Sequence, residues 1–174
     1  MNRMMKRTAA ATIAGGVLAG GMLLATGSAS AMPSDTPCGA SDVNVSVTPD
    51  PTHASGHEAY LITYTAASED TNCKLQGTPT DVSFAGDGQA VGISVVPEPA
   101  SGGAGPVNLR AGHPAESRLV QAAHEAPLPQ IPVSVTFDLP TGPDGQPVSV
   151  AWPEGQPLKG TEVQTTAVSA VDGG

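Results

Sequence analysis

Hydrophobic and polar side chains alternate with a period of two in the segment VNVSVT, residues 43–48. Successive side chains of a β-strand point to opposite faces, so this pattern predicts a strand that buries its three valines. The segment HEAYLITYT, residues 57–65, is rich in aromatic and β-branched residues and predicts a second strand. Between them, Pro49-Asp50-Pro51 predicts the end of the first strand, because proline cannot donate a hydrogen bond to a ladder.

Other short apolar segments are separated by Gly, Pro and Asp, residues that favour turns. These segments lie at residues 82–84, 91–96, 107–110, 117–123, 133–139, 148–152 and 161–171. The clearest hairpin joins residues 133–139 to residues 148–152 through Asp144-Gly145. Seven to nine short strands with no amphipathic helix predict an all-β fold in which two sheets form a β-sandwich.

The first 31 residues have the pattern of a cleaved signal peptide. Three basic residues precede an apolar run at residues 9–25, and Ala29-Ser30-Ala31 fits the A-x-A pattern that signal peptidase recognises. Cleavage there leaves one mature domain, residues 32–174. The alternative is an uncleaved membrane anchor, because the apolar run approaches the ~18 residues of a membrane span. We expect cleavage, no stable membrane insertion afterwards, and secretion into the extracellular or cell-wall space.

The predicted mature domain is strongly acidic. The whole chain has a formal net charge of −9, and the domain keeps four Lys or Arg and all 16 Asp and Glu, which gives −12. Such a surface repels phosphate backbones and anionic headgroups, so nucleic acid and anionic membranes are not expected partners. Its Gly and Pro residues lie between the apolar alternations, which favours turns between strands over a disordered chain.

The chain contains two cysteines, Cys38 and Cys73, and an exported chain of this kind is expected to join them in a disulfide. The bridge would connect the start of the first strand to the segment after the second, with Gly77 allowing the bend that follows. The chain-entropy model gives such a loop roughly 4 kcal/mol of stabilisation. The alternative, a reactive thiol pair, lacks the C-x-x-C spacing of redox motifs.

Several short motifs resemble those of the secreted actinobacterial proteins grouped as the domain-of-unknown-function 4232 family. They are Pro37-Cys38, residues 61–65 (LITYT), Cys73-x-Leu75-x-Gly77-x-Pro79, and Leu109-x-x-Gly112-x-x-Ala115. Together with a C-terminal pair of strands they span most of residues 37–171. The resemblance implies an immunoglobulin-like β-sandwich of antiparallel strands with no established activity. Two features depart from the family: Ala66-Ala67 stands where many members have an Asn, and a second cysteine pair is absent.

Two His-Glu pairs, at His57 and His124, invite comparison with zinc proteases. A zinc site of that class needs a second His four residues later on the same helix, whereas this chain has Leu61 and Leu128 at those positions. No nucleophile elbow and no phosphate-binding or dinucleotide-binding glycine pattern occurs in the sequence. We therefore predict no catalytic residues, no metal site and no cofactor.

Aromatic side chains can stack on sugar rings, and this chain has five of them. Tyr60 and Tyr64 share one face of the second predicted strand, and Trp152 can lie nearby. A sandwich core also needs aromatic residues, so either core packing or an exposed ligand platform is compatible with the sequence.

Three functional hypotheses follow. The first is a non-catalytic secreted module, not an enzyme, that binds an extracellular protein or envelope component. The second is a carbohydrate-binding module that uses Tyr60, Tyr64 and Trp152. The third is a hydrolase whose site is assembled from residues distant in the sequence.

Overall fold

A computed structural model describes residues 34–52, 56–99, 105–123 and 129–171 of the chain. The predicted signal peptide, residues 1–31, lies outside the described residues. The described part consists of strands, their connections and one short 3₁₀ turn, η1 (Ala40–Asp42). In these four ranges, no helix is long and apolar enough to cross a membrane.

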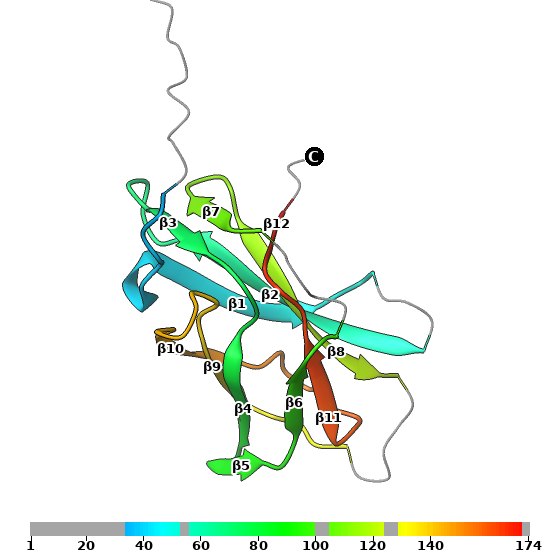
Figure 1. Cartoon of the computed structure of the whole chain (residues 1–174). Coiled ribbons are helices and arrows are strands. Elements are labelled where there is room, and N and C mark those ends of the chain that lie inside the picture. Colours follow the sequence, from blue (N-terminus) through cyan, green and yellow to red (C-terminus); the bar gives the residue numbers. More distant parts are fainter. Residues whose placement is uncertain (1–33, 53–55, 100–104, 124–128, 172–174) are drawn as a thin grey trace, which may run out of the picture. The chain divides into compact units, whose positions relative to one another are not determined.

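The larger sheet has the strand order β1-β2-β8-β11-β6, and β12 pairs with β8 as well (Figure 1). Its strands are β1 (Val43–Pro49), β2 (His57–Ala66), β6 (Ser94–Pro97), β8 (Ala115–Ala122), β11 (Glu162–Thr165) and β12 (Ser169–Ala170). The register places Val45 opposite Tyr64 and Val47 opposite Ile62. Partners in an antiparallel ladder share one face of the sheet, so the valines of β1 and the aromatic residues of β2 point together into the core.

The smaller sheet has the order β10-β9-β4-β5, and a separate two-stranded ribbon pairs β3 with β7. These strands are β3 (Asn72–Leu75), β4 (Thr80–Gly86), β5 (Gln89–Val91), β7 (Val107–Arg110), β9 (Ser134–Asp138) and β10 (Pro147–Ala151). Phe84 lies opposite Val135 across β4 and β9, and Val148 lies opposite Phe137 across β10 and β9. These pairs form the inner face of the smaller sheet.

One hydrophobic core fills the space between the sheets and extends under the β3–β7 ribbon. Tyr64 from the larger sheet and Phe137 from the smaller sheet meet edge to face, with ring centroids 6.4 Å apart. Leu75 and Leu109 contribute from the ribbon, and both are fully buried. On each strand, the alternating hydrophobic residues of the sequence therefore point into the core, and the polar residues between them point to solvent.

The predicted all-β sandwich is confirmed, but its strands are more numerous and less uniform than predicted. The described residues form twelve strands, and β6 pairs with β11 in parallel, so the sheets are not purely antiparallel. The predicted strand at residues 91–96 is divided at Gly92 and Ile93, because β5 belongs to one sheet and β6 to the other. The predicted strand at residues 161–171 is likewise divided into β11 and β12, which both pair with β8.

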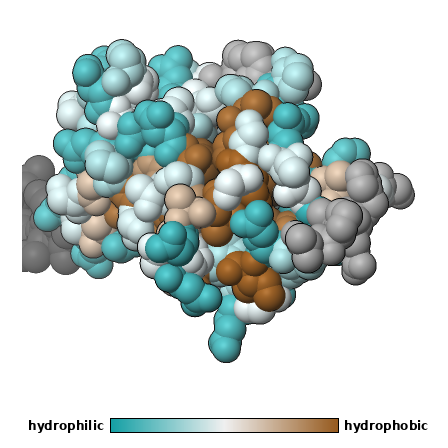
Figure 2. Space-filling model, turned by 90° about the horizontal axis from the view of Figure 1, so that it is seen from below, coloured by the Kyte–Doolittle hydropathy of each residue, from teal (hydrophilic) through white to brown (hydrophobic). Residues whose placement is uncertain are grey.

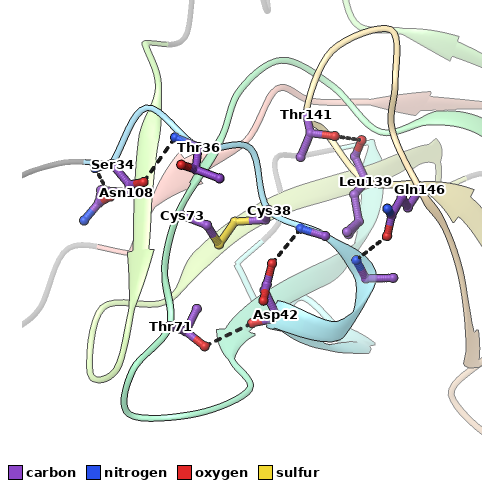
Figure 3. The surroundings of a disulfide bond; sticks show 12 residues. Ser34, Thr36, Cys38, Asp42, Thr71, Cys73, Asn108, Leu139, Thr141 and Gln146 are labelled. Atoms are coloured by element: carbon purple, nitrogen blue, oxygen red, sulfur yellow. Dashed lines mark hydrogen bonds between the residues drawn. A yellow bond between two sulfur atoms is a disulfide. The ribbon is translucent and has the colours of Figure 1, made fainter.

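Cys38 and Cys73 form the predicted disulfide, with their α-carbons 4.9 Å apart (Figure 3). Cys38 lies just before η1, and Cys73 lies in β3, which was not predicted as a strand. The bridge therefore connects the segment before the first strand to the segment after the second, as the sequence suggested. Both cysteines are buried within the core cluster.

Hydrogen bonds extend this connection over the whole segment at residues 34–38. The Cys38 amide donates to the Lys74 carbonyl (3.1 Å), and the Lys74 amide donates to the Thr36 carbonyl (2.8 Å). The Ser34 amide donates to Oδ1 of Asn108 on β7 (2.9 Å; Figure 3). The N-terminal segment thus lies as a parallel neighbour of β3, bridged at Pro37 and Lys74.

Candidate functional site

The three aromatic residues considered as a ligand platform lie in the core. Tyr60 and Tyr64 face inward from β2, and Trp152 directly follows β10. Their exposed fractions are 3%, 0% and 4%. Of the two possibilities that the sequence left open, the aromatic residues adopt core packing and not the exposed platform: these rings are covered by the second sheet and by the β10–β11 connection, so they have no free face for a sugar.

Aromatic contacts join the two sheets at this position. The rings of Tyr60 and Trp152 are tilted at 54° with centroids 4.3 Å apart, and Phe84 meets Trp152 edge to face at 5.3 Å. Such pairs contribute about 0.5–1.5 kcal/mol each beyond the burial of their area. The aromatic residues of the chain are therefore used for cohesion between the sheets.

The polar atoms of the same rings hold the connection at residues 152–161. The Tyr60 hydroxyl donates to the Pro157 carbonyl (2.9 Å), and Nε1 of Trp152 donates to the Gln156 carbonyl (2.8 Å). Gln121, buried on β8, donates to the Pro157 carbonyl and accepts from the Lys159 amide. Tyr and Trp can be buried at low cost only when their polar atoms find partners, and this connection supplies them.

Burial has the expected effect on both tyrosines. It raises the pKa of Tyr60 to about 12, and the negative charge of Glu58 contributes in the same direction. It also raises the pKa of Tyr64 above its ordinary value, although the Tyr64 hydroxyl and Ser117 are hydrogen-bonded at 2.9 Å. Both phenols therefore stay protonated at neutral pH, so neither is suited to act as a base.

Ionised side chains meet on the outer face of the larger sheet. Nε of Arg118 lies 2.8 Å from Oδ2 of Asp50, and its Nη2 lies 2.8 Å from Glu116. Burial alone would raise the pKa of Asp50, but hydrogen bonds from Arg118 and Thr52 outweigh it, and the pKa is lowered. The hydrogen bond to Asp50 raises the pKa of Arg118. This cluster fastens the start of the β1–β2 connection to β8.

The first His-Glu pair is not arranged as a metal site. His57 and Glu162 line a shallow depression on the larger sheet, while Glu58 is paired with Nζ of Lys159 at 2.6 Å. Among the described residues, no group of three or more His, Cys, Asp and Glu is placed to hold a metal ion. The second pair, at His124, lies outside the described residues.

Small, uncharged side chains form two adjacent rows on the outer face of the smaller sheet, and Asp138 lies in the row beyond them, between Thr80 and Pro147. One row across the four strands consists of Ala90, Ala85, Ser134 and Ala151, and the next consists of Ser83, Thr136 and Ser149. We call these seven residues the small-residue face. Thr136 and Ser149 are hydrogen-bonded to each other at 3.0 Å. No Lys, Arg, Asp or Glu belongs to these two rows.

Two exposed hydrophobic residues adjoin the small-residue face. Ile131 and Val133 are 56% and 55% exposed, and the Val133 amide donates to the Ala85 carbonyl (2.8 Å). Figure 2 shows hydrophobic surface among polar residues on the side seen from below, the end at which β5 lies in Figure 1. The sequence pattern placed Val133 with the inward residues of its strand, but β9 begins at Ser134 and Val133 precedes it.

Comparison with known proteins identifies one family. The model of a domain of unknown function, DUF4232, matches residues 38–171, which includes both cysteines and both sheets. Neither a search of curated proteins nor a search of solved structures finds a match.

Proposed function

The chain belongs to the DUF4232 family, and from this premise we propose that it is a secreted, non-catalytic module that binds an extracellular protein or envelope component. The proposal includes cleavage of residues 1–31 as a signal peptide, an immunoglobulin-like arrangement of the sandwich, and an actinobacterial origin. A buried disulfide supports an oxidising compartment, since such bridges persist mainly outside the cytosol.

The observation that carries the proposal is the small-residue face together with Ile131 and Val133. Side chains of this size let a flat partner surface approach the sheet closely, and the absence of charge in the two rows reduces the desolvation cost of covering them. Ile131 and Val133 extend this face with exposed apolar surface, and contiguous apolar surface rimmed by polar residues marks protein interaction sites. A protein partner is therefore favoured over a glycan, for which the aromatic residues would need to be exposed.

The proposal that the module is non-catalytic is supported by the contacts of several ionisable side chains, which pair with one another or lie in the core. Asp50, Arg118 and Glu116 hold one another, and Lys159 and Glu58 form a second pair. The two tyrosines are protonated core residues. These groups have roles in cohesion, which accounts for them without a reaction.

Site-specific photocrosslinking on intact producer cells tests the proposal. A photoreactive amino acid is placed at Ser149, on the small-residue face, and in a second variant at Ile131. Glu162, exposed on β11 in the other sheet, is the matched control position. We expect Ser149 and Ile131 to capture the same defined protein, identified by mass spectrometry, and Glu162 not to capture it. Capture of glycan alone, or equal capture from Glu162, would contradict the proposal.

A further inference from the structure

Among the described residues, strand β1 forms one edge of the larger sheet and has the longest edge without a hydrogen-bonded neighbour in either sheet, with β10 of the smaller sheet lying close to it. Two backbone hydrogen bonds mark the ends of the ladder that β1 forms with β2. At one end the Asp50 amide donates to the Ala59 carbonyl, and at the other the Ala67 amide donates to the Asp42 carbonyl. In an antiparallel ladder, residues with bonds to the neighbour alternate with residues whose backbone groups point away. The N–H and C=O groups of Val43, Val45 and Val47 therefore point away from β2, towards the free edge.

The other edges are shorter or interrupted. β5 has three residues, β6 ends at Pro97, and β10 begins at Pro147. Short strands and prolines are the usual means by which sheet edges avoid pairing with other chains, and lysines are another. β1 has no lysine and no bulge, and its single proline, Pro49, is the last residue of the strand. This edge is therefore the one best suited to accept a further strand.

We infer that two copies of this chain associate through β1, antiparallel and about a two-fold axis at Val45. In this register Val43 of each copy lies opposite Val47 of the other, and the two Val45 residues face each other. The three outward N–H groups and three outward carbonyls of each copy are then all paired. The larger sheet becomes continuous across two copies. This inference is independent of the proposed function, because it concerns a different surface.

Neighbouring registers satisfy fewer backbone groups. A shift by two residues towards the C-terminal end of the strand would place Val43 opposite Pro49, which has no N–H to donate. A shift by two residues in the other direction would place Val47 opposite Ser41, which belongs to the 3₁₀ turn and not to the strand. The register centred on Val45 is thus selected by the limits of β1 itself.

The charge distribution makes β1 an edge at which two copies of this acidic chain can meet without adding repulsion. Two copies of the proposed mature domain, residues 32–174, each carry a charge of −12 (4 Lys or Arg against 16 Asp and Glu) and repel, so self-association requires contact through uncharged segments. β1 contains no charged side chain. At its ends, Asp42 would face Thr48 of the other copy, and Asp50 is already paired with Arg118. No carboxylate is therefore brought opposite a carboxylate.

The mass of the protein in solution tests this inference. The protein is recovered from the medium of cells that express the whole chain and is studied by analytical ultracentrifugation over a range of concentrations. We expect a concentration-dependent species of twice the monomer mass. Val45→Pro removes an outward N–H and leaves the ladder with β2 complete, so it should abolish that species. Ser149→Pro, at the exposed edge of β10, is the matched control and should retain it.

Disulfide trapping tests the register without altering the core. Asn44 and Ser46 are exposed on the outer face of β1. In the proposed dimer, Asn44 of one copy lies opposite Ser46 of the other copy. These two residues form a pair without backbone hydrogen bonds, the kind of pair in which side chains are closest. The double variant Asn44→Cys/Ser46→Cys should form a covalent dimer rapidly on non-reducing gels, and each single variant should do so more slowly. A protein that stays monomeric at all concentrations, a dimer unaffected by Val45→Pro in a folded variant, or no trapping of the double variant would overturn the inference.

Discussion

Tyr60 and Trp152 pack against each other in the core, and each donates a hydrogen bond from its polar end to the connection between β10 and β11. One pair of residues thus performs two tasks. The rings bind the sheets together, while the hydroxyl and the indole N–H fix the path of a segment that contains two prolines. Tyr60 and Trp152, which the sequence offered as parts of a ligand platform, instead hold the two sheets and the β10–β11 connection together.

The first prediction separates these two tasks. Trp152→Ala removes a buried ring and should lower the free energy of unfolding by about 3–5 kcal/mol, because a cavity remains. Tyr60→Phe keeps the ring and removes only the hydroxyl, and Gln121 still donates to the Pro157 carbonyl, so we expect a loss of about 1 kcal/mol. Denaturant unfolding followed by circular dichroism measures both. Equal losses would show that the hydrogen bond of the Tyr60 hydroxyl contributes as much to stability as the buried ring of Trp152.

The disulfide should account for a large part of the stability. Cys38→Ala/Cys73→Ala opens the loop and should lower the free energy of unfolding by about 4 kcal/mol, since the denatured chain regains its freedom. The control is the unaltered protein treated with reductant under native conditions, which should react slowly because both cysteines are buried. Free thiols detected in the purified, untreated protein would contradict the assignment of the bridge.

Asp50 should make stability depend on pH in the acidic range. Its pKa is lowered on folding, so the stabilisation it provides is present above its ordinary value of 3.8 and is lost as the pH falls through the lower folded-state pKa. Asp50→Asn should cost about 2 kcal/mol at neutral pH, and less in strong acid, where the carboxyl of the unaltered protein is protonated. Unfolding experiments over a pH series measure the difference. The exposed Asp87, replaced by Asn, is the control for the substitution and should change the free energy of unfolding at neutral pH by less than about 0.5 kcal/mol.

Much of the fold was predictable because strand alternation reflects burial directly. Residues 43–48 and 57–65 became β1 and β2 with nearly the predicted ends. The disulfide was predictable because the chain has the pattern of an export signal and its two cysteines allow only one pairing. Gly77, with φ of +94°, provides the bend that its place in the Cys-x-Leu-x-Gly-x-Pro run suggested.

The rest depends on contacts between distant segments, which local patterns do not encode. In β3 the polar Asn72 and Lys74 alternate with the buried Cys73 and Leu75, and the strand was identified only by its pairing with β7. The parallel pairing of β6 and β11 follows from the crossing of the chain between sheets at Gly92. The burial of Trp152 and Tyr60 likewise depends on the connection that covers them. Strand identity could thus be predicted, but not which strands become neighbours.

Val133 and Val135 illustrate this limit and provide a fourth prediction. They are equivalent in the alternating pattern, yet Val133 is 55% exposed and Val135 is fully buried. Val135→Thr places a hydroxyl in the core and should cost about 2 kcal/mol. Val133→Thr should change stability by less than about 0.5 kcal/mol. Thermal unfolding of the two variants is the measurement, and similar losses would mean that Val133 is also a core residue.

The last prediction concerns the backbone at Gly77. Its φ of +94° is in the region that L-residues rarely adopt, although a Cβ there would meet no atom within 4 Å. Gly77→Ala should therefore cost about 1–2 kcal/mol through backbone strain alone. Gly92 is the matched control, since a Cβ there also has open space but its φ is not positive. Gly92→Ala should be neutral or slightly stabilising, because it restricts the unfolded chain.

Because the Gly77 carbonyl also accepts from the Val168 amide at 2.8 Å, a shift of this turn should loosen the segment that leads to β12. Faster hydrogen exchange at Val168 in Gly77→Ala than in Gly92→Ala would reveal that coupling, and equal exchange would show that the turn is strained without transmitting the change.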